Sequence, residues 1–114
     1  MAMSGAAKLD RRVQFERFTL VDDGFGVTEV WADHGSPVWA SRTDVSDMEK
    51  ATAGGLEASL LSRFVVRSTG FTRDLDPKDR LTQGGLTWNI LGIKEAKDGR
   101  HRFLEITARA RTDG

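Results

Sequence analysis

Strict alternation of apolar and polar residues near the end of the chain most constrains its fold. In the segment 102–111 one set of alternate positions is apolar: Leu104, Ile106, Ala108 and Ala110. The positions between them are polar or charged: Glu105, Thr107, Arg109 and Arg111. Because successive side chains of a β-strand point to opposite faces, this pattern predicts a strand with one face in a core and the other in solvent.

Turn signals divide the rest of the chain into short candidate strands. The candidate strands are residues 12–20, 27–32, 38–45, 60–69, 80–83 and 86–96. Asp23-Gly24, Gly84-Gly85 and Asp98-Gly99 are typical of tight turns between antiparallel strands. Short strands at this spacing favour a mainly β fold, a small antiparallel β-barrel, over a parallel α/β fold.

Three segments depart from this regular pattern. The apolar phase changes between Phe15 and Phe18, which predicts a bulge or twist near Arg17. Residues 46–59 are small and charged and predict a long inserted loop or a short helix, capped by Ser46 and ended by Gly54-Gly55. Residues 73–79 are interpreted as a solvated turn. We expect a flexible arm over residues 1–10 and a single domain over 11–112, with the loop at 44–60.

Aromatic residues at strand positions are the candidates for the core of such a barrel. We expect Phe15, Trp39, Phe64 and Trp88 to be buried. Trp31 is assigned less firmly, since an exposed ring there would indicate a contact between subunits.

The charge of the chain is balanced overall but uneven along its length. Lys plus Arg and Asp plus Glu both number 17, which argues against a dedicated DNA-binding module, although a nucleic-acid-binding barrel of the OB type stays open as an alternative. Residues 1–20 and 100–114 each carry a net charge of +2, which leaves the middle at −4. Basic ends of this kind can orient neighbouring subunits. The candidate interface residues are Arg11, Arg12, Trp31, Arg109 and Arg111.

Few residues are suited to catalysis or to metal binding. The chain has no Cys, and its two His, His34 and His101, lie in expected turns without metal-ligand spacing. Its carboxylates at 74, 76 and 79 lack the glycine and closing glutamate of a calcium loop. No signal peptide or membrane-spanning run is visible. We therefore expect no enzyme activity, no catalytic residue, no cofactor and no metal site.

The order of several segments resembles the phage head–tail joining family, the head-closure or stopper proteins of long-tailed phages and gene-transfer particles. The segments that carry the resemblance are residues 9–17, 23–31, 38–41, 63–67, 86–93 and 102–106. Trp88 departs from the family, which often has another residue at that position. The match extends from about Leu9 to Arg111.

This resemblance implies a small β-barrel that forms a hexameric or dodecameric ring between the portal–adaptor and the tail. Such a ring retains packaged double-stranded DNA, without sequence-specific binding, and docks the tail. A tail-terminator ring is the nearest alternative. The expected location is the neck of a phage-like particle, reached from the cytoplasm of a bacterial host.

The resemblance also implies a role for the inserted loop, whose match here is residues 44–60. In related proteins this loop points into the channel. Its charged residues, Asp44, Asp47, Glu49 and Glu57 against Lys50, give −3 per subunit, which would repel DNA phosphates. Gly54 and Gly55 would let the loop swing between closed and open positions.

Overall fold

The computed structural model describes residues 9–45, 59–96 and 101–111, which form strands and one short helix. The elements are β1 (Arg11–Asp22), β2 (Val27–Asp33), β3 (Val38–Asp44), β4 (Ser59–Arg67), α2 (Gly70–Arg73), β5 (Arg80–Gln83), β6 (Leu86–Glu95) and β7 (Phe103–Arg111). The mainly β fold predicted from the sequence is confirmed.

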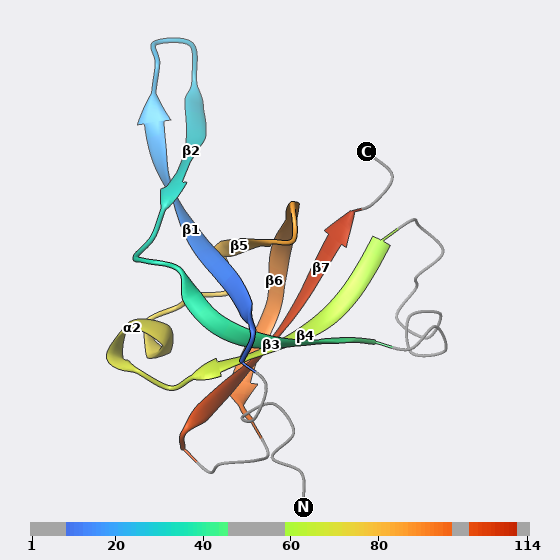
Figure 1. Ribbon diagram of the computed structural model, residues 1–114. Helices are drawn as coiled ribbons and strands as arrows, with labels where there is room; N and C mark the ends of the chain where they lie inside the picture. The colour runs from blue at the N-terminus through green and yellow to red at the C-terminus, as the bar shows by residue number, and fades with distance from the viewer. Residues whose placement is uncertain (1–8, 46–58, 97–100, 112–114) are drawn as a thin grey trace, which may run out of the picture.

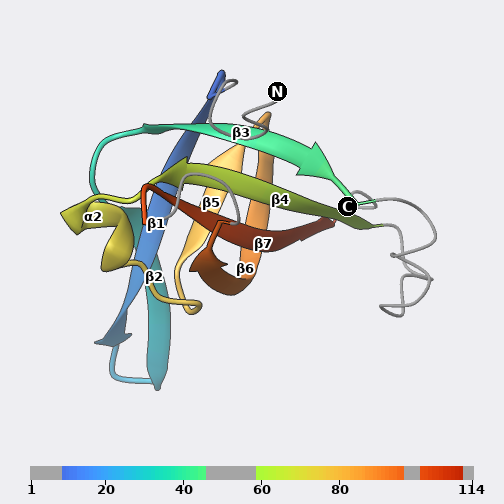
Figure 2. The same cartoon turned by 90° about the horizontal axis from the view of Figure 1, so that it is seen from below.

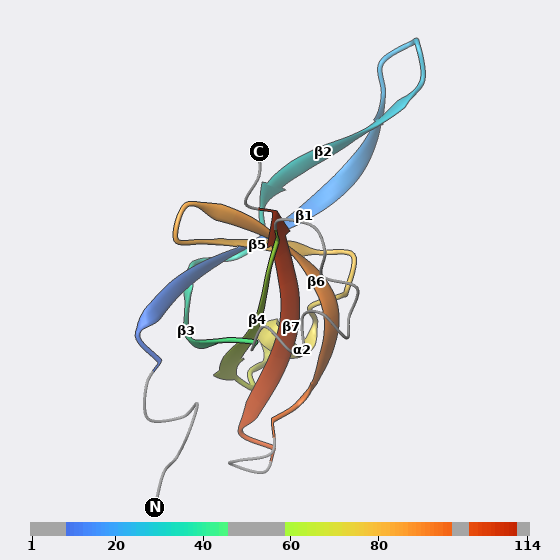
Figure 3. The ribbon, with the colours of Figure 1, turned by 90° about the vertical axis from the view of Figure 1, so that its right-hand side faces the viewer.

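The strands form a closed antiparallel barrel with one strand outside it. Their order is β2-β1-β3-β4-β7-β6-β5, and a further pairing between β1 and β5 closes the ring of strands (Figures 1 and 3). Closure gives each barrel strand a neighbour on both sides, which removes the exposed edges that would invite aggregation. The prediction of a small antiparallel barrel is therefore confirmed.

Strand β1 belongs both to the barrel and to a projecting hairpin. Residues 11–13 pair with β3, residues 14–16 with β5, and residues 16–22 with β2. The second half of β1 thus leaves the barrel wall with β2 as its only partner (Figure 1).

That change of partner explains the change of apolar phase near Arg17. Val13 and Phe15 are fully buried in the barrel, whereas Leu20 is 65% exposed on the hairpin. A bulge or a twist was expected near Arg17, and the ladder between β1 and β2 contains no bulge, since it has no register shift. An irregularity of this kind lies instead in β6, between Ile90 and Gly92.

The barrel interior is filled by large side chains from several strands. Phe15, Phe64 and Trp88 are fully buried as expected, and the rings of Phe64 and Trp88 meet edge to face at 5.1 Å. The apolar face of β7 also enters this core, as its alternation predicts: Leu104, Ile106, Ala108 and Ala110.

Trp39 is the exception, because it is 50% exposed and its placement in the core was wrong. The register sets Trp39 opposite Arg12, and the Arg12 guanidinium lies 4.6 Å from the centre of its ring. Alternation along β3 turns the neighbouring Ala40 inward. Trp39 therefore lies on the outer surface of the barrel, and Ala40 lies in the core.

The connection from β4 to β5 contains the helix α2, which the sequence did not predict. Thr69 and Thr72 cap this helix reciprocally through their side chains. The buried Thr72 hydroxyl also donates to the carbonyl of Arg67 at 2.6 Å. Figure 2 shows α2 beside the connection from β2 to β3. There Gly35 adopts φ +73°, and a Cβ atom on it would lie 2.5 Å from the Phe71 ring.

Some expectations fall on residues that the structure does not describe. The short helix after Ser46 and the Gly54-Gly55 hinge lie outside the described residues, as do the arm up to residue 8 and the turn at Asp98-Gly99. Strands β6 and β7 on either side of that turn do pair antiparallel, as the expected hairpin requires.

Candidate assembly surfaces

The β1–β2 hairpin projects from the barrel (Figure 1). It presents apolar side chains to solvent. Phe25 at its tip is 99% exposed, and Leu20 and Val27 are each 65% exposed. Residues 18–33 contain four acids, Asp22, Asp23, Glu29 and Asp33, and no Lys or Arg. Exposed apolar groups clustered on one element indicate a contact surface. We call residues 18–33 the acidic hairpin.

Local hydrogen bonds order the tip of the acidic hairpin. The Asp22 carboxylate accepts from the Gly24 N–H at 2.9 Å, and the Asp23 carboxylate accepts from the Phe25 N–H at 2.9 Å. The Asp23 N–H donates to the Gly26 carbonyl at 3.2 Å. These bonds hold the turn in one conformation with the Phe25 ring directed away from the rest of the chain.

Packing within the chain orders the base of the acidic hairpin. The rings of Phe18 and Trp31 lie 5.1 Å apart, and the Arg80 guanidinium lies 4.1 Å from the centre of the Trp31 ring. Arg80 also pairs with Glu16 at 2.6 Å. Trp31, predicted as a subunit contact, is therefore half-buried against its own chain.

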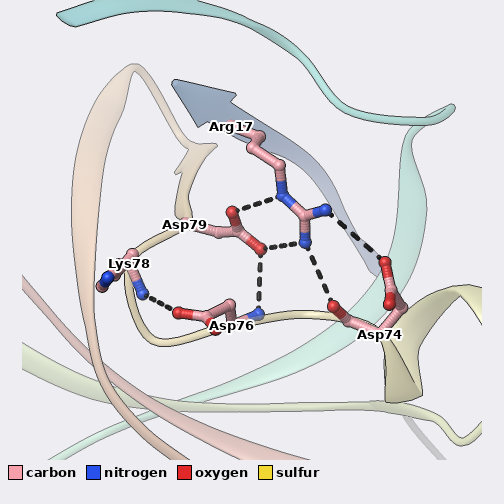
Figure 4. A network of polar contacts seen from close by, with 5 residues as sticks. All are labelled: Arg17, Asp74, Asp76, Lys78 and Asp79. Carbon is pink, nitrogen blue, oxygen red and sulfur yellow. Dashed lines mark hydrogen bonds and ion pairs between the residues drawn. The ribbon is translucent and has the colours of Figure 1, made fainter. Parts of the chain in front are cut away.

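An ion pair joins the same region to the loop after α2 (Figure 4). The Arg17 guanidinium donates through Nε and Nη2 to both oxygens of Asp79, each at 2.8 Å. Nη2 also donates to the Asp74 carbonyl at 3.1 Å, and the Asp76 N–H donates to Asp79 at 2.9 Å. The Asp79 side chain is only 3% exposed. The turn expected at 73–79 is present, and Asp74, Asp76 and Lys78 are exposed as predicted, but Asp79 departs from the prediction because its carboxylate is buried and paired with Arg17.

The surroundings of Asp79 hold its carboxylate in the charged form. Burial alone would raise the pKa of Asp79, but the hydrogen bonds from Arg17 and from the Asp76 backbone, with the charge of Arg17, outweigh burial and lower that pKa below 3.8. The hydrogen bonds to Asp79 in turn raise the pKa of Arg17. The pair therefore stays ionised and ties the hairpin base to the loop at neutral pH.

A largely apolar groove lies between α2, the start of β3 and the end of β4. Its volume is about 440 Å³. Its lining includes Ser36, Pro37, Val38, Trp39, Arg67 and Phe71. Phe71 packs on the core residue Phe15, with ring centres 6.2 Å apart. We call this feature the Trp39 groove.

Asp44 is the one candidate channel residue that the structure describes. Its carboxylate accepts a hydrogen bond from the Ser62 hydroxyl and pairs with Arg42 at 3.0 Å. The hydrogen bond from Ser62 lowers the pKa of Asp44, burial opposes that change, and Arg42 adds to it. Arg42 in turn donates to Gln83 at 2.9 Å and lies 4.8 Å from the centre of the Trp88 ring. The contacts with Ser62 and Arg42 therefore hold the Asp44 side chain against the barrel wall.

The other candidate channel residues are Asp47, Glu49, Lys50, Gly54, Gly55 and Glu57, and all lie outside the described residues.

The basic candidate interface residues do not form one patch. Arg11 and Arg12 lie on β1, while Arg109 and Arg111 lie on β7. Two strands separate β1 from β7 in either direction around the barrel. The two basic segments therefore lie on opposite walls.

The sequence predicts the hairpin through its Asp23-Gly24 turn, but it did not predict that the hairpin projects as an exposed surface, and it did not predict the Trp39 groove. A signal for the acidic surface is present in the sequence, since residues 18–33 contain no cation. No such signal exists for the groove, because it is assembled from distant segments.

The described residues contain no group of three or more His, Cys, Asp or Glu side chains placed to hold a metal ion. In the same part of the chain no helix is long and apolar enough to cross a membrane. The exposed apolar hairpin and the apolar groove are surfaces suited to contacts between the subunits of an assembly.

Comparison with protein families identifies the chain. A sequence model of the phage head completion protein family matches residues 5–111, so the chain belongs to this family. This confirms the resemblance drawn from the sequence and assigns the chain to the structural proteins of phage and phage-like particles.

Two solved structures share the fold. A chain from the virion of a native gene transfer agent particle is 29% identical with a TM-score of 0.67, and the match covers 92% of this chain and 96% of that one. A protein of Shigella flexneri 2a, solved in solution, is 25% identical with a TM-score of 0.67 and coverage of 94% and 96%. The comparison with curated protein sequences found no match.

Proposed function

We propose that this protein is the stopper of a tailed-phage-like particle. Copies of it form a ring between the portal–adaptor and the tail, retain the packaged DNA and present the surface on which the tail docks. The observation that carries the proposal is the match to a chain of a gene transfer agent virion over 92% of this protein. Membership of the phage head completion family supports the same role.

The fold suits a ring subunit. Since each strand of the barrel wall has two neighbours, the wall can contact other copies only through side chains, and the free strand edges lie on the acidic hairpin. The ion pair between Arg17 and Asp79 fixes the base of that hairpin to the loop after α2. A projecting element with a fixed base is suited to a defined contact with a neighbour.

The base of the inserted loop is equally well held. Asp44 faces Ser62 across the β3–β4 ladder and is bound by both Ser62 and Arg42. Because Arg42 compensates the charge of Asp44, the remaining charges of the loop would repel DNA. These are the acids Asp47, Glu49 and Glu57, partly balanced by Lys50. Residues 45–58 are then the part of the loop that acts on DNA in the channel.

Microscopy of the intact particle neck tests the location. The proposal expects a symmetric ring of this chain directly below the adaptor. Density that places the chain in the tail-terminator ring, or only in the capsid shell, would contradict the proposal.

Two loop variants test the retention of DNA separately. The first removes residues 47–57 and leaves Asp44, Arg42 and Ser62 in place. The second keeps the length but changes Asp47, Glu49 and Glu57 to their amides. Full heads of the first variant are expected to leak DNA or fail to join tails, and the second is expected to slow DNA passage. Unchanged particle yield and DNA retention in the first variant would refute the channel role.

A further inference from the structure

We propose that the acidic hairpin of one copy inserts Phe25 into the Trp39 groove of the next copy. The inference extends the proposed ring by naming its subunit contact. The two surfaces are defined by the structure of the single chain, so the contact can be tested with or without the particle.

Phe25 has the properties of an anchor. It is 99% exposed, the most exposed of the large apolar residues in the described part of the chain. The hydrogen bonds of the turn fix its backbone, so little freedom is lost when the ring enters a pocket. Buried aromatic anchors of this kind contribute most to protein interfaces.

The Trp39 groove has the properties of the matching socket. Its volume of about 440 Å³ exceeds what one aromatic side chain fills, and its walls are largely apolar. The ring of Phe71 in its wall is held by the close approach of Gly35 and by packing on Phe15. Trp39 offers a half-exposed ring for stacking.

Charge favours a second copy of this chain as the occupant. The acidic hairpin carries four acids and no base. The groove contains Arg67, and the guanidinium of Arg12 lies on the ring of Trp39 at 4.6 Å. An acidic element with an apolar tip therefore meets an apolar groove with basic residues around it.

The placement of the two surfaces makes the contact intermolecular. The tip of the hairpin projects away from the barrel, whereas α2 and the start of β3 lie beside the barrel near the base of the hairpin (Figure 1). Because the hairpin tip and the Trp39 groove lie on different surfaces of one subunit, their contact is head-to-tail. Head-to-tail contacts generate a ring when the rotation that relates neighbouring subunits closes on itself.

Cysteine crosslinking tests the contact directly, because the chain has no native Cys. Thr28→Cys labels the exposed part of the hairpin near its tip and keeps the acids and the turn hydrogen bonds, and Ser36→Cys labels the groove. A short bismaleimide should join a mixture of the two single variants into dimers, while each variant alone stays monomeric. In assembled particles the double variant should give a ladder of oligomers that stops at the subunit number of the ring.

The outcomes separate this contact from the proposed function. Particles whose necks contain the ring but show no crosslink would overturn the contact, as would a crosslink from the tip to an adaptor or tail protein. Necks without this chain would overturn the stopper role, and crosslinking of the concentrated purified protein would still decide the contact. Absence of the mixed dimer there would overturn it.

Substitution of the anchor gives a second measurement. Phe25→Ala should weaken self-association about tenfold or more, and Phe25→Leu should weaken it less. Leu91→Ala is the matched control, since Leu91 is 50% exposed but lies on β6, away from both surfaces. Thermal unfolding of the monomer checks that both positions leave the fold intact. Equal association of Phe25→Ala and Leu91→Ala would contradict the proposal.

Discussion

Arg17 and Asp79 lie 62 positions apart in the chain and form a two-pronged ion pair in which both contacts measure 2.8 Å. Arg17 lies at the point where β1 leaves the barrel, and Asp79 lies in the turn before β5. The Asp79 side chain is 3% exposed, whereas that of Arg17 is 37% exposed. The pair therefore connects the root of the projecting hairpin to the body of the barrel.

Removal of the cation from this pair should destabilise the fold. Arg17→Met leaves a buried carboxylate without its partner, and we expect the free energy of unfolding to fall by about 2–3 kcal/mol. Arg73→Met is the matched control, because Arg73 is exposed and makes a single long contact with Ser68 at 3.3 Å. Urea unfolding measures both. A loss for Arg17→Met no larger than that for Arg73→Met would show that the pair contributes nothing.

The same pair predicts a loss of stability in acid. The pKa of Asp79 in the folded protein lies below its unfolded value of about 3.8. Stability from this group is therefore complete well above pH 3.8, and it declines as the pH falls through that value toward the folded pKa. Unfolding should be followed from pH 6 to pH 2 for the native chain and for Asp79→Asn. The variant is expected to be less stable at pH 6 and to lose less stability in acid. Parallel pH profiles would be inconsistent with this linkage.

Replacement of Gly35 should cost more than replacement of a glycine in the hairpin turn. Gly35 has φ +73°, and an added Cβ would lie 2.5 Å from the Phe71 ring. Gly24 also has a positive φ, +91°, but no atom lies within 4 Å of its added Cβ. Gly35→Ala should lower the free energy of unfolding by about 2–4 kcal/mol, and Gly24→Ala by about 1–2 kcal/mol from backbone strain alone. Chemical denaturation distinguishes them, and equal losses would mean that the Phe71 ring can move aside.

The two contacts of Asp44 should both lower its pKa. The hydrogen bond from Ser62 is the largest single cause of the lowered pKa, and Arg42 adds to it through a hydrogen bond and through its charge. Ser62→Ala and Arg42→Gln should therefore each raise the pKa of Asp44. The titration of the Asp44 carboxyl by nuclear magnetic resonance measures both shifts. An unchanged pKa in either variant would show that the substituted residue does not support the loop base.

Alternation and turn signals predicted most of the barrel. The apolar positions of β7 and the fully buried Phe15, Phe64 and Trp88 were expected from the sequence, since the two-residue period of a strand is a local property. Trp39 shows the limit of that argument. Alternation says that Trp39 and Ala40 face opposite ways, but which of them faces inward is decided by the barrel.

Local patterns predict the hairpin, but they do not predict its departure from the barrel or the salt bridge at its base. The change of apolar phase at Arg17 is visible in the sequence, yet a bulge and a change of partner give the same pattern. The sequence predicts solvated acids at 73–79, because nothing near them in the chain indicates that Asp79 forms an ion pair with Arg17.

The sequence by itself determined the strand pattern, the balanced charge and the resemblance to head-closure proteins, because each is written in the order of the residues. Only the tertiary structure decided that β1 leaves the barrel at Arg17, that Asp79 is buried against it, and that Phe25 and the Trp39 groove lie on different surfaces. The physical reason is that these features join residues far apart in the chain, and their contacts exist only once the strands have closed.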